Sequence, residues 1–405
     1  MTSFSQAFVN NAFYEYYNST SFSIPIISNF NQREFGFFFI GGHVIRHKCF
    51  KNPDDLLIFL SRNAPSDIYR SGAYYEAPKA KMSQKGWLGS DLIFDIDSDH
   101  IVTSCDKLHD IWYCIECGYI GQGVSPDKCP ECKKKRIKIN TWPCKICIDS
   151  AKKETKKLIS FLNEDFGFSE EEIHLFFSGH RGYHVHVENN SIKNLDTVAR
   201  KEISDYITGL GIDLLNLKRG DSLRSFHLSN IGWQKRLKIG LLNFLSNATN
   251  DDLRKAGIIR NLKRDLIIEE KKLIMDRCVQ DGMWEGIQAL NSINWKKLFL
   301  YVKNLESSQI DTVVTTDIHR LIRMNNSLHG KTGLKKVKFP IINIDSFDPF
   351  KEAVAFKGGN IKVLVSNVPY FTLGDKMFGP YENQIVELPT AAAILLICKE
   401  RAELV

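Results

Sequence analysis

Alternating apolar and polar positions predict a set of β-strands in the chain. Residues 33–39 and 44–47 flank Gly41-Gly42, and a glycine pair between two apolar runs is a hairpin signal. Residues 183–187 alternate strictly, so His184 and His186 should share one face of a strand. The same kind of pattern predicts further strands over residues 91–97, 173–177, 312–316, 337–344 and 361–368.

Apolar residues at helical spacing occupy the segments between these strands. A helix is expected over residues 54–63, and another after residue 147, where Ala151, Leu158 and Leu162 would lie on one face. Residues 195–305 are mostly helical in pattern, amphipathic and basic, and a last helix is expected over about 390–401. The predicted fold is an α/β, mixed-sheet core that is interrupted twice.

Length and composition indicate a globular protein of more than one lobe. The chain has 405 residues, which is too long for one compact core. Of these residues 43% are hydrophobic and 25% are charged, as is usual for a globular protein. The net charge of +7 fits a polyanionic partner but does not identify one. The start shows no signal-peptide pattern, and the longest apolar run, residues 391–398, is too short to span a bilayer.

Two carboxylates at the end of an apolar run are the first candidate site. In a strand, side chains at positions i and i+2 point to the same face, so Asp95 and Asp97 should stand side by side. Crowded carboxylates repel each other unless a cation lies between them, and their hard oxygen ligands suit Mg²⁺ or Mn²⁺. The alternative is an ordinary strand end with solvated acids.

Cysteine spacing indicates metal binding directly after this acidic run. Seven of the ten cysteines lie between residues 105 and 147, six of them in three Cys-x-x-Cys pairs. The first two pairs match a tetrahedral zinc ribbon whose four ligands leave no open position, so its role should be structural. The predicted ligands of this ribbon are Cys114, Cys117, Cys129 and Cys132.

The third cysteine pair needs two more ligands to hold zinc. Cys144 and Cys147 form this pair, and Cys105 and His109 stand on the other side of the ribbon. A second, Cys₃His zinc site at the base of the insert is therefore predicted. The alternative is a free cysteine pair at the start of a helix.

Two further stretches are dense in polar and basic residues. The turn over residues 178–182 contains Ser178, two glycines, His180 and Arg181, a combination that can cradle phosphate oxygens. Residues 311–333 begin with an acid before a predicted strand, continue with a predicted helical turn that carries Arg320 and Arg323, and end in a glycine-rich loop. The Gly-Lys-Thr in that loop is not a P-loop, because Asn325 stands where the first glycine is required.

Taken in order, these stretches resemble the catalytic small subunit of archaeal and eukaryotic DNA primases. The matching stretches are Arg33-Glu34-Phe35-Gly36-Phe37, Asp95-Ile96-Asp97, Ser178-Gly179-His180-Arg181-Gly182-Tyr183-His184, Asp317-Ile318-His319-Arg320-Leu321-Ile322-Arg323 and Ser327-Leu328-His329-Gly330-Lys331-Thr332-Gly333. The chain departs from the family at Met324-Asn325-Asn326, where members often have a proline-containing loop, and in its cysteine-rich insert.

The resemblance implies a primase-type catalytic core and DNA-dependent synthesis of short RNA primers by two-metal nucleotidyl transfer. It implies that Asp311 joins Asp95 and Asp97 as the third catalytic acid. The nucleotide contacts that it implies are Glu34, Arg46, Ser178, His180, Arg181, His184, Arg323 and His329. The implied partners are a primase large subunit in a heterodimer, a single-stranded DNA template and nucleoside triphosphates, with Mg²⁺ or Mn²⁺ and Zn²⁺ as cofactors.

The resemblance also sets the expected division of the chain. Residues 1–104, 148–192 and 306–405 would form the catalytic core, 105–147 the zinc-binding insert and 193–305 a helical lobe. A protein of this family would act in the cytoplasm of an archaeal-type cell, associated with the nucleoid. Two other classes share some of these features: a metal-dependent nuclease or phosphatase, and a non-catalytic zinc-ribbon adaptor for nucleic acids.

Overall fold

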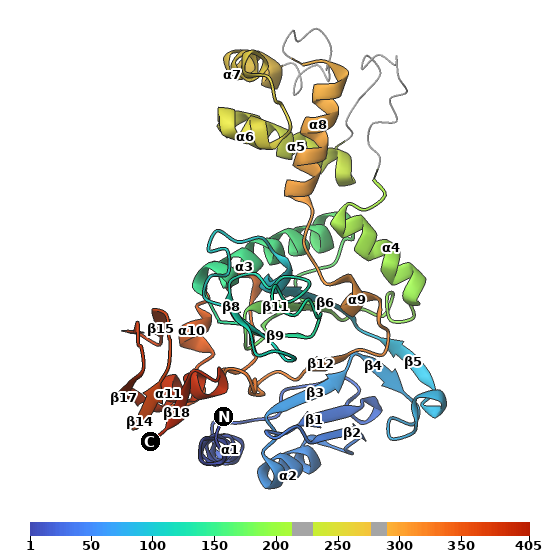
Figure 1. The fold of residues 1–405 in the computed structure, drawn as a ribbon. Helices are drawn as coiled ribbons and strands as arrows, with labels where there is room; N and C mark the ends of the chain where they lie inside the picture. The colour runs from blue at the N-terminus through green and yellow to red at the C-terminus, as the bar shows by residue number, and fades with distance from the viewer. Residues whose placement is uncertain (213–229, 277–289) are drawn as a thin grey trace. The chain divides into compact units, whose positions relative to one another are not determined.

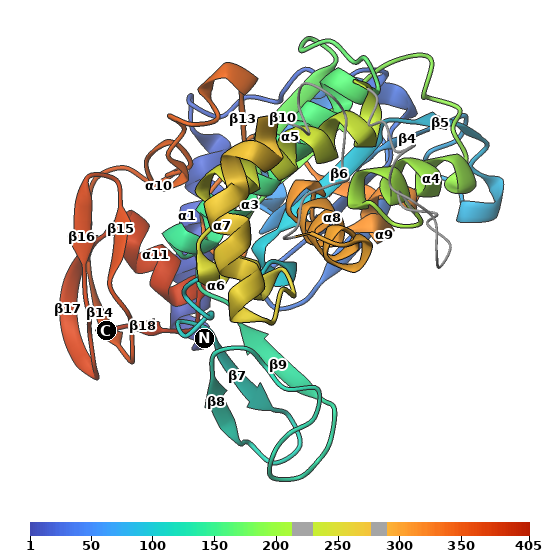
Figure 2. The ribbon, with the colours of Figure 1, turned by 90° about the horizontal axis from the view of Figure 1, so that it is seen from above.

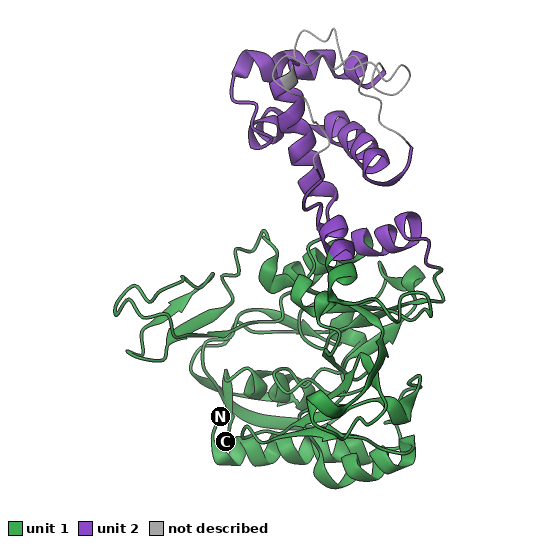
Figure 3. Cartoon of the chain, turned by 90° about the vertical axis from the view of Figure 1, so that its right-hand side faces the viewer, with its two compact units in different colours: residues 1–156, 169–201, 309–405 green, residues 157–168, 202–308 purple. Residues whose placement is uncertain are grey.

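The computed structural model describes residues 1–212, 230–276 and 290–405 (Figure 1). The chain divides into two compact units, which Figure 3 shows in different colours. Unit 1 consists of residues 1–156, 169–201 and 309–405, and unit 2 of residues 157–168 and 202–308. The predicted five-part division into core, insert and lobe stays a prediction.

The described chain contains both helices and several sheets, which confirms a fold of mixed helices and strands, and every strand pairing in it is antiparallel. The helices are α1 Ser3–Asn18, α2 Pro53–Asn63, α3 Lys145–Ser160, α4 Thr197–Thr208, α5 Gly232–Asn247, α6 Asn250–Lys255, α7 Asn261–Asp276, α8 Ser292–Glu306, α9 Thr312–Thr316, α10 Pro349–Glu352 and α11 Thr390–Cys398. The predicted helical stretch 195–305 contains α4 to α8 in its described part, and residues 213–229 and 277–289 lie outside the described residues.

The strands are mostly short and antiparallel. They are β1 Phe35–Phe38, β2 Val44–Lys48, β3 Asp67–Ser71, β4 Ala73–Tyr75, β5 Trp87–Ser90, β6 Leu92–Asp97, β7 Ile111–Cys114, β8 Ile120–Gln122, β9 Ile137–Asn140, β10 Ile173–Phe177, β11 Gly182–Val187, β12 Leu321–Arg323, β13 Val337–Phe339, β14 Asn360–Val365, β15 Phe371–Leu373, β16 Lys376–Phe378, β17 Gln384–Pro389 and β18 Ala402–Leu404.

Two four-stranded sheets in unit 1 carry five of the predicted site residues, namely Arg46, Asp95, Asp97, His184 and Arg323. One sheet has the order β13-β10-β11-β6 and the other the order β12-β3-β1-β2. In the first sheet β11 pairs antiparallel with β6, so that His184 lies opposite Asp95 and Gly182 opposite Asp97. A Cβ atom at Gly182 would lie 2.3 Å from the carbonyl oxygen of Ile96, so a glycine at this position permits the close approach.

The cysteine-rich insert forms a small sheet of its own. Its strands have the order β8-β7-β9, and Figure 2 shows them extending away from the larger sheets of unit 1. The C-terminal segment forms a third sheet in the order β17-β14-β18, against which the buried apolar helix α11 packs. Lys399 directly follows that helix.

Several predicted elements are confirmed. The hairpin around Gly41-Gly42 is β1 and β2, the acidic run is β6, and the alternating run is β11. The buried run over Ile173–Phe177 is β10, and the last predicted helix is α11. No helix of the described chain is both long and apolar enough to cross a membrane.

Three local predictions are wrong. Residues 312–316 form helix α9 and not a strand, because the Asp311 carboxylate caps it, accepting from Val313 N at 2.9 Å and Val314 N at 3.4 Å. The expected helical turn that carries Arg320 and Arg323 is instead a turn at residues 318–319 followed by β12. Strand β12 pairs with β3. The strand predicted over residues 337–344 ends at Phe339, since Pro340 has no N–H to continue the ladder.

Candidate active site

Three carboxylates converge at the end of β6. Asp95 and Asp97 project from the same face of β6, as the alternation predicted. Asp311 is the N-cap of α9, and its backbone N–H donates to the Asp95 carbonyl oxygen at 2.8 Å. All three are partly exposed, so solvent and ligands can reach them. The structure therefore brings together the two acids of the sequence motif and a third from more than 200 residues later.

Like charges and burial perturb these acids strongly. Burial, followed by the charges of Asp97 and Asp311, raises the pKa of Asp95 from its usual 3.8 to about 7. Burial and Asp99 raise the pKa of Asp97 to about 6. Raised carboxylate pKa values mean that the folded chain disfavours the charged forms in the absence of a cation. Either protonation or binding of metal ions would therefore stabilise the three carboxylates.

His184 faces the acids from the neighbouring strand. Its Nε2 atom lies 3.5 Å from the Asp95 Oδ1 atom, and its buried Nδ1 atom has no hydrogen-bond partner among the residues that the structure describes. Burial, and the charges of Lys336 and Arg323, hold the pKa of His184 well below its usual range, so the imidazole is neutral at pH 7. Lys336 is itself buried, and its Nζ donates to the Arg323 carbonyl oxygen at 2.8 Å.

The turn before β11 packs against the loop that contains His329. The hydroxyl of Thr332 donates to the Gly179 carbonyl oxygen at 2.6 Å, and the rings of His180 and His329 stack with centroids 5.1 Å apart. Gly179 has a φ of +90°, and a Cβ atom there would lie 3.1 Å from the His329 Cβ. These contacts bring together two segments that both belong to the predicted nucleotide site.

Arg181 lies beneath this turn and is paired with acids. Its side chain is 1% exposed, and its Nη1 atom donates to both oxygens of Asp110 at 3.0 and 2.9 Å. Its Nη2 atom donates to Asp99, which follows the catalytic strand. Asp97 in turn accepts from the backbone N–H of Asp99 at 3.0 Å. Arg181 therefore links the end of β6 to Asp110.

Arg323 is paired in a similar way. Its guanidinium donates to the Asp67 Oδ1 atom at 2.5 Å and to the Tyr69 hydroxyl at 3.0 Å. Burial alone would raise the pKa of Asp67, but Arg323 and His329 bring it down to about 2. The buried residues Ser178 and His180 and the partly exposed His329 form no ion pair with a carboxylate among the residues that the structure describes.

Arg46 lies on β2 of the other four-stranded sheet, and Glu34 directly precedes β1 of that sheet. The buried Glu34 carboxylate forms an ion pair with Lys85 and accepts from Arg46 Nε at 3.3 Å. Burial raises the pKa of Glu34, but Lys85 and Arg46 outweigh it and the net pKa is lowered. Arg46 is exposed, with 45% of its side chain accessible. These two residues form a cluster with Lys85 and His47 rather than with the three acids.

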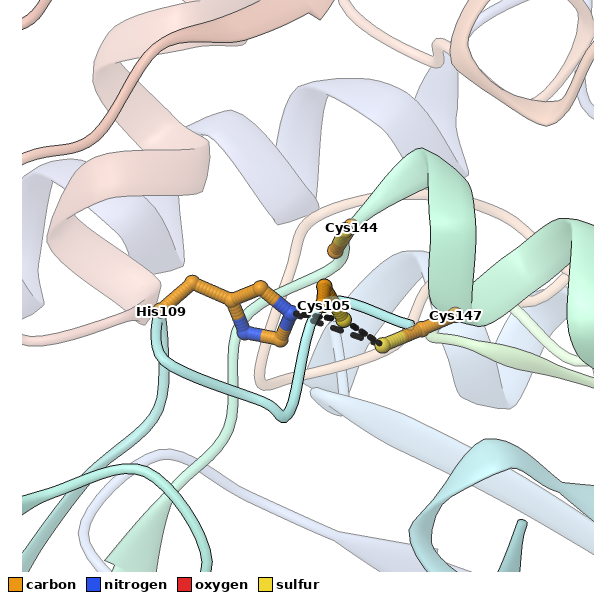
Figure 4. Close-up of side chains that lie close together, drawn as sticks. All are labelled: Cys105, His109, Cys144 and Cys147. Atoms are coloured by element: carbon orange, nitrogen blue, oxygen red, sulfur yellow. Dashed lines mark hydrogen bonds between the residues drawn. The ribbon is translucent and has the colours of Figure 1, made fainter. Parts of the chain in front are cut away.

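Two groups of thiolate and imidazole ligands are arranged to hold metal ions. Cys114, Cys117, Cys129 and Cys132 form one, with their ligand atoms within 4.8 Å of one another. Cys105, His109, Cys144 and Cys147 form the other, as predicted, with ligand atoms within the same distance (Figure 4). The His109 Nε2 atom lies 3.3 Å from the Cys105 sulfur and 3.4 Å from the Cys147 sulfur.

The second group is connected to Arg181 through Asp110. The Nδ1 atom of His109 lies 2.8 Å from the Asp110 Oδ1 atom, and the same carboxylate accepts from Arg181. A carboxylate bonded to the second nitrogen of a ligating histidine is the usual orienting partner of a metal site. Neither Asp110 nor Asp99 could be assigned to this chain of contacts from the sequence, because Arg181, the partner that they share, is 71 and 82 residues away from them.

The chain is similar to known proteins over nearly its whole length. The family model for the DNA primase small subunit matches residues 127–341. The DNA primase small subunit PriS of Cenarchaeum symbiosum is 32% identical over 392 residues, which cover 96% of this chain and 95% of that protein. The PriS of Nitrosopumilus maritimus is 30% identical, with 98% and 97% covered, and that of Archaeoglobus fulgidus is 32% identical, with 97% and 96% covered.

The match extends over nearly the whole chain and includes every stretch that contributes an acid to the end of β6. Long, ordered similarity of this kind is not produced by a shared Asp-x-Asp motif or a shared zinc ribbon alone. The chain belongs to the DNA primase small subunit family.

Proposed function

We propose that this chain, a primase small subunit and so a nucleotidyltransferase that makes RNA primers for DNA replication, works through Asp95, Asp97 and Asp311. The observation that carries this assignment is the convergence of the three carboxylates at the end of β6, where the Asp311 N–H donates to the Asp95 carbonyl oxygen, in a site that solvent can reach. A fold that forces carboxylates together in this way gains stability when cations bind between them. Their oxygens suit Mg²⁺ or Mn²⁺.

We infer that the three acids hold two ions rather than one. We assign Asp95 and Asp97 to both ions and Asp311 to one of them. Two such ions, when bound, supply a clamp for the attacking and leaving oxygens of an in-line displacement.

The reaction that this site would perform is attack of a ribonucleotide 3′-hydroxyl on the α-phosphate of a nucleoside triphosphate, with pyrophosphate leaving. The chain must then position a triphosphate and compensate its charge. We assign the positioning of the triphosphate by hydrogen bonds to Ser178, His180 and His329, which form no ion pair with a carboxylate among the described residues, and to His184, whose neutral ring lies beside Asp95. Because the Nδ1 atom of His329 accepts from the Lys331 backbone N–H at 3.1 Å, its Nε2–H remains free to donate.

Arg181 and Arg323 were also predicted to contact phosphate, and we retain them in the proposed site. Each keeps a carboxylate partner, so the net positive charge that it offers to a phosphate is smaller than that of an unpaired cation. Glu34 and Arg46 would contact the incoming nucleotide from the other sheet. The exposed guanidinium of Arg46 is available for this, whereas the buried carboxylate of Glu34 would hold it in place.

The alternative functions are less well supported. A metal-dependent nuclease or phosphatase would use the same acids but has no need for the basic and imidazole groups that surround the turn at Gly179. A zinc-ribbon adaptor would not need the acid cluster. The family match favours primer synthesis over both. The finer fold assignment, a primase-type core with a zinc-binding insert and a helical lobe, belongs to this same proposal.

We further propose that both cysteine groups hold zinc. Thiolate-rich sets of four ligands select zinc, and four protein ligands leave no open position for chemistry, so both roles are structural. In the second group, zinc would fix His109, and the Asp110 carboxylate would carry that constraint to Arg181 and the end of β6. The expected partners are a primase large subunit, a single-stranded DNA template and nucleoside triphosphates, in the cytoplasm and near the nucleoid.

Asp95→Asn and Asp97→Asn should each abolish template-directed incorporation of labelled ribonucleotides in Mg²⁺. We expect a loss of more than about a hundredfold, because even residues that only support metal ligands contribute about 10–100-fold. Asp127→Asn, which removes an exposed acid from the insert, is the matched control and should leave incorporation unchanged. Near-normal incorporation by either active-site variant would contradict the assignment of Asp95 and Asp97 as catalytic acids. Release of nucleotides from DNA by the wild-type protein would indicate a nuclease.

Asp95→Asn should also stabilise the protein when Mg²⁺ is absent. The folded pKa of Asp95, about 7, lies above its usual 3.8, so the wild-type chain loses stability as the pH rises through this window. The variant does not titrate there, and its advantage in free energy of unfolding should grow from near zero at pH 4 to on the order of 4 kcal/mol at pH 8. Urea unfolding of the zinc-loaded protein in chelator-free buffer measures this difference in free energy of unfolding between variant and wild type. A difference that is absent, or that does not change with pH, would contradict the electrostatic account.

Metal analysis of the purified chain should give two zinc ions. Cys144→Ser should remove one of them, because it leaves the second group with three ligands, and the ribbon should stay loaded. Cys49→Ser, which changes a free cysteine outside both groups, should keep two. A stoichiometry of one that Cys144→Ser does not change would eliminate the second zinc site and retain the ribbon.

A further inference from the structure

Lys399 is a buried cation that no sequence motif identified. It follows α11, whose residues are almost all buried and apolar, and it lies outside residues 127–341 of the family match. Its side chain turns inward and the residue is 2% exposed. The Nζ atom lies 2.7 Å from the Nε2 atom of His180, in the turn before β11. The last segment of the chain therefore reaches the proposed nucleotide site.

The backbone around Lys399 is held firmly in place. Its N–H donates to the Leu395 carbonyl oxygen at 3.0 Å, which continues the hydrogen bonding of α11. Its own carbonyl oxygen accepts from the Asn140 side-chain amide at 2.6 Å, at the end of β9. Because both backbone groups are bonded, the position of the side chain is set by the fold rather than by a flexible terminus.

The surroundings of Lys399 are basic. No carboxylate of the described chain lies within ion-pair distance of its Nζ atom, in contrast to Arg181 and Arg323. Burial, together with the charges of Arg181 and Lys331, lowers the pKa of Lys399 to about 7. Burying a cation without an anion costs stability unless a ligand supplies the missing charge. The cluster thus lacks an anion.

The neighbours of Lys399 indicate where that anion would enter. His180 stacks on the partly exposed His329, and Lys331 beside it is exposed. The Thr141 hydroxyl lies 3.1 Å from the same His180 nitrogen that faces Lys399. These groups come from four separate segments of the chain and offer several hydrogen-bond donors to one ligand. Phosphate oxygens are the acceptors that such a set of donors recognises.

We propose that Lys399, together with His180 and His329, binds the phosphates of the incoming nucleoside triphosphate. This inference rests on the proposed function and adds a C-terminal residue to its nucleotide site. His180 lies two residues before Gly182, which pairs with Asp97, so a triphosphate bound at the acids would extend toward this cluster. A template backbone would instead need an exposed basic stripe, because it runs on in both directions.

The test is binding of ATP, ADP and AMP in Mg²⁺ to the full chain, measured by calorimetry for wild type, Lys399→Met and Lys399→Arg. Lys399→Met keeps the length of the side chain and removes its charge. We expect it to weaken ATP binding by about tenfold to a hundredfold, as for loss of one charge-assisted contact, and to leave AMP binding within about twofold. Lys399→Arg should retain most of the affinity for ATP.

Two further readouts separate phosphate binding from a structural role. Since the charge is buried without an acid, Lys399→Met should not lower the thermal unfolding temperature. In primer synthesis it should raise the KM for the nucleotide more than it lowers kcat. Lys362→Met is the matched control, because it removes the same charge from an exposed position on β14, and it should change none of these values.

Three results would overturn the inference. Unchanged ATP affinity in a folded Lys399→Met variant eliminates Lys399 as a phosphate ligand. A lower unfolding temperature with normal ATP binding assigns it a structural role, and loss of single-stranded DNA binding with normal ATP binding assigns it to the template. If wild-type protein itself bound no ATP in Mg²⁺, the proposed function would fail as a whole, which distinguishes the two claims.

Discussion

Repulsion among Asp95, Asp97 and Asp311 is the interaction on which the rest of the site depends. The antiparallel pairing of β6 with β11 fixes the first two, and a backbone hydrogen bond of 2.8 Å ties Asp311 to Asp95. The acids cannot separate without breaking these bonds, so only protons or cations relieve the repulsion. Burial raises the pKa of both Asp95 and Asp97, and the charges of Asp97 and Asp311 raise that of Asp95 further. Crowded acids of this kind lower the stability of the metal-free protein and favour the binding of cations.

The basic residues around the acids fall into two classes, and the difference between them is functional. Arg181 and Arg323 are buried with carboxylate partners, so their charge is compensated within the protein and they hold strands and loops in place. His180 and Lys399 are buried beside each other without such a partner. In the proposed site, the first class would organise the strands and loops before substrate binds, and the second would gain its counter-charge from the substrate. Zinc binding near His109 would act on the first class, through Asp110.

Local patterns in the sequence were sufficient to predict the elements that carry the site but not all of their contacts. The alternation around Asp95 and around His184 predicted β6 and β11. Cys105 and His109 are potential zinc ligands that the ribbon does not use, and this predicted that they join the third cysteine pair. The run of β-branched residues after Asp311 suggested a strand, yet the N-cap hydrogen bonds of Asp311 make it a helix.

Contacts between distant segments carry no such signal in a single sequence. Nothing in the sequence distinguishes Asp99 and Asp110 from acids on the surface. Only the fold shows that both accept hydrogen bonds from Arg181. Lys399 follows an apolar helix and looks like a surface residue at a helix end, where lysine is common. Only the packing of α11 and the turn before β11 places its Nζ atom against His180.

The stoichiometry of Mn²⁺ binding tests the central claim most directly. Mn²⁺ suits the same oxygen ligands as Mg²⁺ and is observable by electron paramagnetic resonance. With zinc-loaded protein and saturating ATP, and after correction for Mn²⁺ bound by free ATP, the account predicts two bound ions per chain for the wild type. It predicts one ion for Asp311→Asn, because Asp95 and Asp97 remain. A single ion in the wild type, or two ions in Asp311→Asn, would contradict the assignment of the three acids to a two-metal site.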